Sequence, residues 1–363
     1  MRQANTSRRR GAHRGSSGAP KPTAIDLFSG CGGVTVGLKR AGFAVLGAVE
    51  MESKAADTYA ANHPEVRLWR SDIRSLSPHR MMKSLKIRRG DLDLLAGCPP
   101  CQGFSALRTR NGSAKNRDCR NTLPLEMLRF IRAFRPRAVM LENVPRISGS
   151  RAFLAFCNQL KELGYQVEWR LRDAADLGVP QRRRRIVLVA GLRKSIPAAP
   201  DARPRKTVRD AIRRLPRPGR SGDVLHDLVI DHGPHVRALI RDIPKNGGSR
   251  TDLAASRQLD CHRRCDGFKD IYGRMSWDDV APTITGGCFN PSKGRFLHPV
   301  QNRAITLREA ALLQTFPIAY QFLPSHGKQS IALMIGNAFP PEATRRYALE
   351  IARVLRTDAG VAR

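Results

Sequence analysis

Short apolar runs alternate with stretches of helical periodicity along the first half of the chain. The apolar runs predict buried β-strands at residues 24–28, 43–49, 92–96, 137–141 and 186–190. The helical spacing between them predicts helices that run through residues 38–40 and over 53–61, 122–134 and 151–163. Strands that alternate with helices in this way are typical of a parallel sheet covered on both faces, so we expect an α/β fold.

The pattern weakens in the second half of the chain, where Pro, Gly and Arg are frequent between residues 195 and 300. We interpret residues 195–300 as a smaller, loop-rich domain that follows a main domain over residues 22–194. Helical periodicity returns at residues 307–313 and 341–355, and a proline opens the last helix, as helix starts favour. We therefore expect residues 301–363 to return to the main domain.

Basic residues outnumber acidic ones throughout the chain. Residues 1–21 carry six basic side chains and no acidic ones, with much Gly and Ser, which predicts a disordered basic tail. The 363 residues include 64 Lys and Arg against 31 Asp and Glu, a net charge of +33. A polyanionic partner explains this excess, because phosphate neutralisation supplies most non-specific affinity for nucleic acid. An Arg-rich coding bias is the alternative, since many of the arginines are scattered.

Cysteine usage and hydropathy both bear on the compartment. The eight cysteines lack the dense, regular spacing of a secreted disulfide scaffold. No apolar run approaches the ~20 residues that span a bilayer, and the N-terminus has no apolar signal segment. We expect a soluble, cytoplasmic protein with free thiols and no membrane partner.

A glycine-rich turn follows the first predicted strand. Gly30 and Gly32 let backbone approach a ligand closely at the carboxyl end of that strand. The dinucleotide fingerprint fails, because Thr35 stands where its third glycine would be. Asp26 precedes the turn, where it would repel a pyrophosphate but would suit a ligand with a cationic sulfonium and an amino acid group.

Two further acids end strands or follow them. Glu50 ends the second predicted strand and is placed to bind two ribose hydroxyls, and Asp72 is placed to accept from an adenine amino group. Each of these acids alone is more often an ordinary strand-end residue. Together with Asp26 they favour a nucleoside-type ligand.

A candidate nucleophile lies in the stretch 97–105, which follows a predicted buried strand. Two prolines restrict the backbone and place Cys101 on a rigid loop. Cys98 and Cys101 have the spacing of a metal or redox pair, but no second Cys pair or His cluster lies nearby in the sequence. A nucleophilic thiolate needs a lowered pKa or an adjacent acid–base partner.

The partner is expected one strand away. Glu142 ends the next strand, and a buried, protonated glutamic acid there would donate to a ring nitrogen. The run 181–185 precedes a further strand, and alternate residues of a strand share a face, so Gln181, Arg183 and Arg185 point one way and the other two arginines the opposite way. A solvated basic run is the alternative, although the apolar strand follows directly.

Seven motifs resemble those of the DNA cytosine-5 methyltransferases and occur in that family's order. They lie at residues 26–33, 99–105, 142–144, 181–185, 306–310, 314–317 and 336–340. The resemblance implies a Rossmann-like, S-adenosylmethionine-dependent methyltransferase domain over residues 22–194. It also implies that residues 195–300 are a target-recognition domain, in which 282–287 resembles the motif that ends it.

The resemblance implies methyl transfer to carbon 5 of a cytosine flipped out of duplex DNA, as base-modifying enzymes require. Cys101 would attack C6, and Glu142 would hold N3. Arg185 would contact the cytosine O2, and Arg183 would support that site. A base, expected to be a water, would remove the C5 proton before Cys101 leaves.

Cofactor and DNA contacts are also implied. The residues expected at the S-adenosylmethionine site are Asp26, Phe28, Gly30, Gly32, Glu50, Met51, Asp72, Ile73, Pro100, Leu123 and Asn337. The residues expected to contact DNA bases or to close over the flipped base are Gln102, Ser105, Gln181, Thr283 and Thr285. Phosphate contacts are expected at Lys293, Arg295 and His298.

Some positions depart from the family or leave alternatives open. Met334 stands where the family usually has Gln, and Phe339 where Val is commoner, which bears on local packing. Residues 261–265 offer three zinc ligands, two Cys and one His, without an evident fourth, and we expect no metal. A transfer RNA substrate and a catalytically silent DNA-binding relative are the alternatives. A monomer is expected, with a cognate restriction endonuclease as a possible partner.

Overall fold

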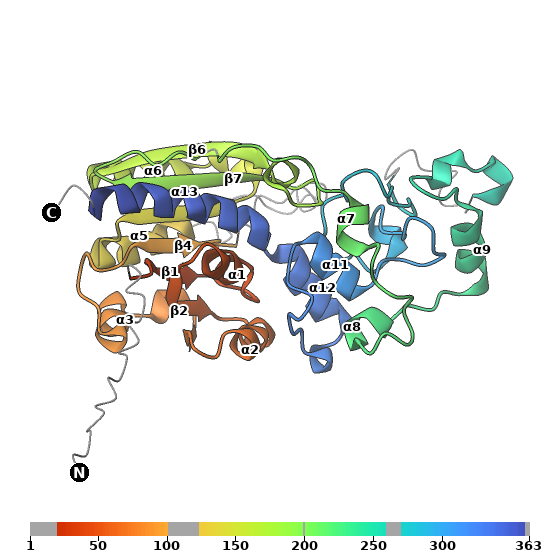
Figure 1. Ribbon diagram of the computed structural model, residues 1–363, viewed down its shortest axis with the longest axis horizontal. Coiled ribbons are helices and arrows are strands. Elements are labelled where there is room, and N and C mark those ends of the chain that lie inside the picture. The colour runs from red at the N-terminus through yellow and green to blue at the C-terminus, as the bar shows by residue number, and fades with distance from the viewer. Residues whose placement is uncertain (1–19, 101–122, 199, 259–269, 360–363) are drawn as a thin grey trace, which may run out of the picture.

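The computed structural model describes residues 20–100, 123–198, 200–258 and 270–359. Its first lobe is built around one sheet of seven strands, in the spatial order β3-β2-β1-β4-β5-β7-β6 (Figure 1). The strands are β1 (Thr23–Leu27), β2 (Ala44–Glu50), β3 (Arg67–Arg70), β4 (Leu94–Gly97), β5 (Ala138–Asn143), β6 (Tyr165–Asp173) and β7 (Arg184–Leu192). Every residue of β4 and β5 is buried, as expected of central strands with helices on both faces.

The sheet is mixed rather than wholly parallel. Strands β1 to β5 are parallel as predicted, but β7 runs antiparallel to both β5 and β6, so the prediction is wrong at this end of the sheet. The connection between β6 and β7 at residues 174–183 is too short for a helical crossover, so the chain must reverse. Strands β3 and β6 were not predicted, because exposed polar residues interrupt the apolar pattern of these edge strands.

Helices cover both faces of the sheet, as predicted. They are α1 (Gly33–Arg40), α2 (Ser53–Asn62), α3 (Pro78–Leu85), α5 (Leu123–Phe134), α6 (Arg151–Glu162) and α13 (Pro341–Ala359). Leu38 of α1 and Tyr347 of α13 pack in the core on one face, and Phe130 of α5 and Phe156 of α6 pack on the other. Among the described residues, no helix combines the length and the apolar character needed to cross a membrane.

The second lobe lies beside the first and contains short helices joined by long connections (Figure 1). Its helices are α7 (Val208–Ile212), α8 (Val224–Asp227), α9 (Pro234–Asp242), α11 (Leu307–Leu313) and α12 (Lys328–Asn337). Ile196 and Ala198 pack in the core of the first lobe, so that core extends past residue 195, where we expected the smaller domain to begin. Helix α11 packs against α7 and α8, and α13 returns to the sheet.

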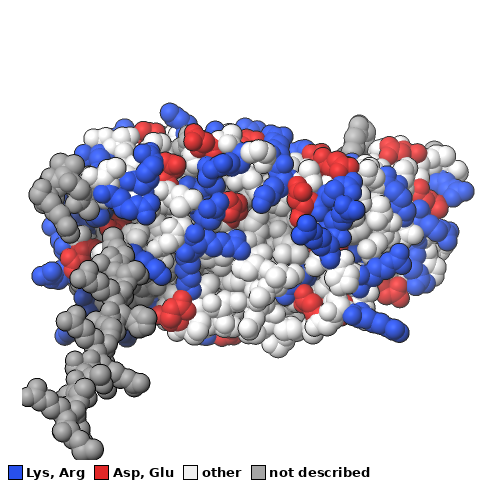
Figure 2. All heavy atoms as spheres, viewed as in Figure 1, with Lys and Arg blue, Asp and Glu red and all other residues white. Residues whose placement is uncertain are grey.

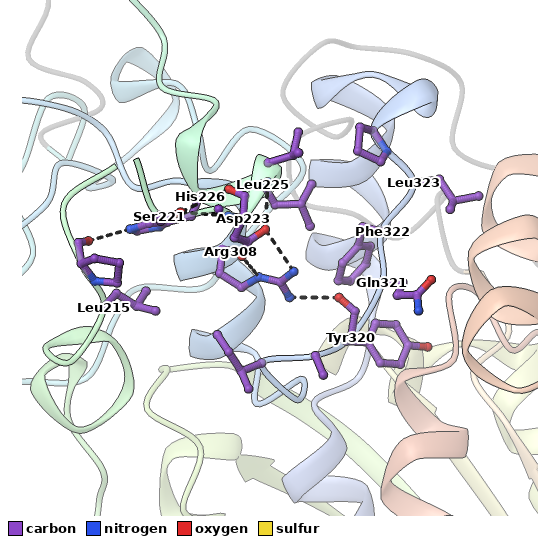
Figure 3. A pocket seen from close by; sticks show the side chains of 16 residues that line it. Leu215, Ser221, Asp223, Leu225, His226, Arg308, Tyr320, Gln321, Phe322 and Leu323 are labelled. Atoms are coloured by element: carbon purple, nitrogen blue, oxygen red, sulfur yellow. Dashed lines mark hydrogen bonds and ion pairs between the residues drawn. The ribbon is translucent and has the colours of Figure 1, made fainter. Parts of the chain in front are cut away.

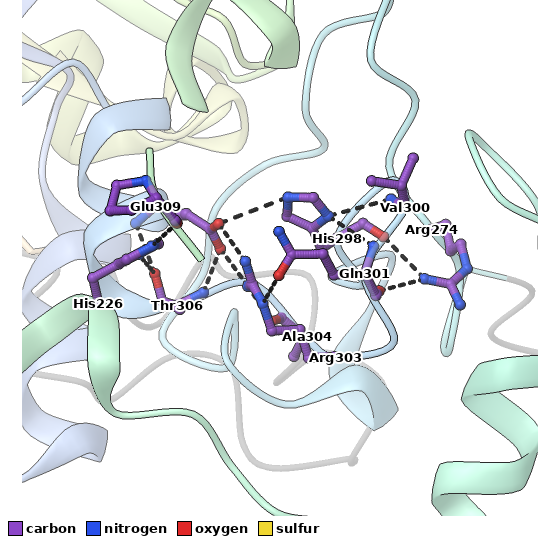
Figure 4. A network of polar contacts seen from close by, with 10 residues as sticks. His226, Arg274, His298, Val300, Gln301, Arg303, Ala304, Thr306 and Glu309 are labelled. Atoms are coloured by element: carbon purple, nitrogen blue, oxygen red, sulfur yellow. Dashed lines mark hydrogen bonds and ion pairs between the residues drawn. The ribbon is translucent and has the colours of Figure 1, made fainter. Parts of the chain in front are cut away.

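Buried polar groups hold the second lobe together. Glu309 accepts two hydrogen bonds of 2.7 Å from the guanidinium of Arg303 and one of 2.8 Å from the backbone N–H of Thr306 (Figure 4). The fully buried guanidinium of Arg274 donates to the backbone carbonyls of Ile240, Ile243, His298 and Gln301. Such satisfied networks add to the apolar clusters of this lobe, a large one around α11 and α12 and a small one around α9.

Candidate active site at the carboxyl edge of the sheet

Four of the candidate groups share one face of the sheet. The registers of β1 with β4 and of β4 with β5 place the side chains of Asp26, Cys98 and Glu142 on the same face, near the carboxyl ends of these strands. Glu142 pairs with Val187 of β7, so Arg185, two residues earlier on β7, faces the same side. Residues far apart in the sequence therefore meet at one edge, where open α/β sheets bind ligands.

The alternation predicted for residues 181–185 is present. Gln181 and Arg183 are buried, Arg185 is partly buried, and the arginines between them are exposed. The run is therefore not a uniformly solvated basic segment.

The glycine turn after β1 has left-handed backbone, with φ of 54° at Gly30 and 97° at Gly32. A Cβ at Gly32 would lie 2.5 Å from the Tyr320 Oη and 2.7 Å from the His63 Nε2, so only glycine fits there. At Gly30 no atom of the described residues lies within 4 Å of such a Cβ. The turn is therefore packed behind Gly32 and open at Gly30. Phe28, which precedes the turn, also has a positive φ of 59° and is partly exposed.

Glu50 is tied to this turn. Its carboxylate accepts a hydrogen bond of 2.8 Å from the backbone N–H of Gly30 and another of 2.8 Å from that of Glu52. Burial raises the pKa of Glu50, and these hydrogen bonds oppose the shift. The next side chain, Met51, is 66% exposed. A fixed carboxylate beside an exposed apolar side chain suits the hydroxyls and base of a nucleoside.

Asp26 lies beneath the turn rather than on its surface. Its side chain is fully buried, and one carboxylate oxygen accepts a hydrogen bond of 2.8 Å from the Thr35 hydroxyl. The other oxygen has no hydrogen-bond partner among the residues that the structure describes. Burial raises the pKa of Asp26 to about 7. Asp26 was expected to contact the ligand directly, but its carboxylate is not exposed to solvent in this structure. Its unpartnered oxygen can still accept a hydrogen bond.

Asp72 and Ile73 follow β3. The Asp72 carboxylate caps a short turn by accepting from the Arg74 backbone N–H at 2.9 Å and is also bonded to the Arg74 side chain. This neighbour lowers the pKa of Asp72, so the carboxylate stays ionised. Ile73 is 3% exposed. A ligand amino group at Asp72 would have to share the carboxylate with Arg74.

Glu142 forms the charged centre of the site. Its side chain is 7% exposed, and its Oε1 lies 2.9 Å from the Nε of Arg185. Burial, and secondarily the negative charge of Glu142, raise the pKa of the Cys98 thiol well above its usual value. Cys98 is therefore a neutral thiol beside Glu142 rather than a thiolate.

Arg183 is enclosed behind this pair. It is 3% exposed and donates from Nη1 to the carbonyl of Ile284 at 3.2 Å. Its Nε has no hydrogen-bond partner within the described ranges. Burial, and then the like charge of Arg185, lower its pKa to about 9. Arg183 connects the site with the backbone of the segment predicted to line DNA.

The loop that carries the predicted nucleophile is anchored by a residue that the sequence analysis did not single out. Asn143 donates from its side-chain amide to the carbonyl of Pro99 at 3.0 Å. Its position directly after Glu142 at a strand end was the available signal. Pro100 is exposed beyond this anchor, and Leu123 is buried at the start of α5. Cys101, Gln102 and Ser105 lie outside the described residues.

Gln181 was expected to contact DNA, and the structure contradicts this expectation. The side chain is fully buried, accepts from the backbone N–H of Ile284 and donates to the Gln314 side chain, each at 2.8 Å. Gln181 thus joins the start of β7 to the second lobe and to the end of α11.

The other expected ligand contacts lie nearer the surface. Thr283 is partly exposed and donates to the carbonyl of Arg182 at 2.7 Å, whereas Thr285 is exposed. Asn337 is exposed at the end of α12. These three positions are accessible to a ligand.

The three expected phosphate contacts differ in exposure. Lys293 is exposed, and Arg295 is partly exposed and bonded to the carbonyl of Gly247 at 2.8 Å. His298 is 3% exposed, with its Nε2 3.8 Å from the Glu309 carboxylate, so the prediction for His298 is wrong. Burial lowers the pKa of His298 to about 4, which also removes the positive charge that a phosphate contact would use.

Other features of the surface lie apart from this site. On the face in Figure 2, Lys and Arg are spread over both lobes, with Asp and Glu among them, and do not form a single patch. A cavity of about 560 Å³ lies between α8 and residues 318–324, beside the ion pair of Arg308 with Asp223 (Figure 3). None of its lining residues is a predicted site residue. The described residues hold no group of three or more His, Cys, Asp or Glu side chains arranged for a metal ion.

Comparisons with known proteins agree over nearly the whole chain. The model of one protein family, described as C-5 cytosine-specific DNA methylase, matches residues 23–353. The Type II methylase M.HgiDII of Herpetosiphon aurantiacus is 35% identical over 91% of this chain and 95% of its own. The Type II methyltransferase M1.HphI of Haemophilus parahaemolyticus is 34% identical over 88% of this chain and 83% of its own.

Solved structures agree as well. A prophage-encoded E. coli protein, solved as a candidate DNA modification methyltransferase, superposes with a TM-score of 0.66 and 26% identity, over 92% of this chain and 99% of that one. The Entamoeba histolytica methyltransferase EhMeth has a TM-score of 0.62 at 16% identity, covering 93% and 99%, and so shares the fold.

Proposed function

The chain belongs to the family of C-5 cytosine-specific DNA methylases, and from this premise we propose that it methylates carbon 5 of a flipped-out cytosine in a specific duplex DNA site. The methyl donor in this proposal is S-adenosylmethionine. The observation that carries the proposal is the meeting of Glu142, Arg185 and the loop that leads to Cys101 at the edge where the glycine turn opens.

The residues around the glycine turn fit this cofactor. Gly30 leaves room for close approach, and the Glu50 carboxylate is oriented to accept from ribose hydroxyls. Met51 is exposed for contact with a base, and the unpartnered oxygen of buried Asp26 favours a nearby cation. When bound, S-adenosylmethionine supplies an electrophilic methyl group on a sulfonium. We assign the remaining contacts to Phe28, Gly32, Asp72, Ile73, Pro100, Leu123 and Asn337.

Glu142 and Arg185 bind the cytosine ring in this proposal. In the free protein, the Arg185 guanidinium is bonded to the Glu142 carboxylate. When Arg185 turns to the ring oxygen O2, the Glu142 carboxylate is free to take up a proton from solvent, which it then donates to N3. Arg183, held by the carbonyl of Ile284, supports Arg185 from behind.

Cys101 is the nucleophile. The Cys101 thiol first loses its proton to solvent, and the thiolate sulfur forms a bond to C6 while N3 takes the proton from Glu142. This makes C5 electron-rich enough to take the methyl group that S-adenosylmethionine would supply, with S-adenosylhomocysteine as the product. A water then removes the C5 proton, the bond between sulfur and C6 breaks, and Glu142 regains its proton. Asn143 holds the carbonyl of Pro99 and so restrains the loop that presents Cys101. Gln102, Ser105, Thr283 and Thr285 are assigned to the DNA side of the site.

Two experiments test the proposal. Bisulfite sequencing of DNA from cells that express the chain should show one methylated sequence. A duplex of that sequence with 5-fluorocytosine at the target should then form a complex with the protein that survives denaturation, and Cys101→Ala should abolish it. Methylated transfer RNA with unmodified DNA would replace this proposal with the RNA alternative. If the protein binds DNA tightly but transfers no isotopic label from the cofactor to it, the catalytically silent DNA-binding alternative would replace this proposal.

The Type II names of the relatives extend the proposal to a partner. We infer that the chain protects its site from a cognate restriction endonuclease and works on chromosomal DNA at the nucleoid. Cleavage of unmethylated DNA at that site by the product of a neighbouring gene would support this inference, and the absence of any such activity would indicate a solitary methyltransferase.

A further inference from the structure

The edge strand β6 is unusually open for its length. Its nine residues pair with β7 without a register shift, and its other side has no strand partner among the described residues. The opposite edge, β3, has only four residues. Natural edge strands are usually protected by shortness, charged side chains, proline or a bulge. Strand β6 contains no proline and its uniform register shows no bulge, so its charged side chains decide what it can pair with.

Apolar side chains lie exposed beside this edge. Trp169 is 38% exposed and Leu171 is 39% exposed on β6, and Leu154 on the neighbouring α6 is 52% exposed. The Trp169 ring packs edge-on against Phe153 with centroids 5.7 Å apart, which holds the indole in place. Strand β6 forms the upper border of the first lobe in the view of Figure 1.

The charges on β6 are complementary to a second copy of the same strand. In an antiparallel pair related by a two-fold axis, opposite residues lie on the same face. With the axis at Trp169, Glu168 of each copy faces Arg170 of the other, and Val167 faces Leu171. With the axis at residue 168 or 170, two like charges face each other on the axis. Charge therefore selects one register.

We propose that two copies of the chain pair antiparallel through their β6 edges, centred on Trp169, and join their two sheets into one. Glu168 accepts a hydrogen bond of 2.7 Å from Ser195 on one oxygen, which leaves the other for Arg170 of the second copy. Arg170 has no carboxylate partner within the described part of the chain. The candidate active site lies at the ends of the inner strands, so both sites stay open. A monomer was expected from the sequence, and the edge of β6 is the observation on which we propose a dimer instead.

The test is the mass of the full-length protein in solution, which does not depend on methyltransferase activity. Sedimentation equilibrium should give a dimer of twice the 40.3 kDa chain mass. The two-fold axis repeats the contact between residues 168 and 170, so Glu168→Arg and Arg170→Glu each create two pairs of like charges across the interface. Each variant should therefore raise the dimer dissociation constant about tenfold or more. The double variant restores both pairs of opposite charges and should return the dimer dissociation constant to within about threefold of the wild-type value.

Glu162→Arg is the matched control, because it makes the same charge change at an exposed residue of α6, outside the paired strand. It should leave the dimer intact. A wild type that stays monomeric at all concentrations overturns the proposal, as does a dimer insensitive to both single changes. Two weakened single variants without recovery in the double variant overturn the proposed register, and circular dichroism identifies any variant that has not folded.

Discussion

Glu142→Gln separates the chemical role of Glu142 from its structural one. Glutamine has nearly the same size, and its side-chain oxygen still accepts from the Arg185 Nε, which lies 2.9 Å from Glu142 in the wild type. The variant should therefore fold, with a cost of about 1–3 kcal/mol for weakening a charged hydrogen bond. What it loses is the proton that Glu142 delivers to N3. General acid catalysis contributes about 10²- to 10⁴-fold, or roughly 3–5.5 kcal/mol of barrier.

The assay is single-turnover transfer of a tritiated methyl group from S-adenosylmethionine to the target duplex, at saturating DNA and cofactor. The rate should fall by about 10²- to 10⁴-fold, whereas the cofactor dissociation constant, set around Gly30 and Glu50, should change less than about threefold. Glu162→Gln, an exposed change on α6, is the control and should match the wild type. If the Glu142→Gln variant transfers the methyl group at a rate within tenfold of the wild type, Glu142 is not the proton donor to N3.

Three further predictions follow from the same geometry. Cys98→Ala should keep methyltransferase activity within about tenfold of the wild type, because the raised pKa of Cys98 keeps its thiol neutral, whereas Cys101→Ala should abolish transfer in the same assay. Gly32→Ala should lower the unfolding temperature and weaken cofactor binding in calorimetry, because its Cβ would meet Tyr320 at 2.5 Å in a left-handed backbone that itself costs about 1–2 kcal/mol. Burial raises the pKa of Asp26 to about 7, so the folded state holds a proton that the unfolded chain releases near the ordinary value of 3.8. The contribution of Asp26 to stability is therefore greatest below pH 3.8 and falls as pH rises toward 7, by at most about 4 kcal/mol, and Asp26→Asn should remove this part of the pH dependence in urea unfolding.

The central strands could be predicted from the sequence because their burial is continuous. The runs at residues 24–28 and 92–96 are apolar except for one aspartate each, and they became β1 and β4 in the middle of the sheet. Strand β6 has only one buried residue and several charged ones, without a regular alternation, so its pattern matches that of a surface segment. The reversal of β7 depends on the unpredicted β6 and was missed for the same reason.

The candidate site divides in a similar way. Glu142 and the alternating run 181–185 could be placed locally, because a strand end and a two-residue period fix where side chains point. The burial of Gln181 could not be predicted, since its partners Ile284 and Gln314 are more than a hundred residues away in the sequence. His298 was expected to contact phosphate for a different reason: nothing in the local sequence indicates that Glu309, eleven residues later, lies beside its buried ring.

The net charge of +33 is weaker evidence for a DNA partner than the arrangement of a few arginines. Arg274, Arg303 and Arg308 are buried and bind carbonyls or carboxylates inside the second lobe, so part of the arginine content is structural. On the visible face, Lys and Arg together are dispersed among acids (Figure 2). Arg185 differs from all of these, because it is only partly buried, bonds to the Glu142 carboxylate and lies at the edge where the glycine turn opens. Because Arg185 can leave the Glu142 carboxylate and bind the O2 of a base instead, its position supports a nucleobase ligand. Scattered surface charge gives no such support.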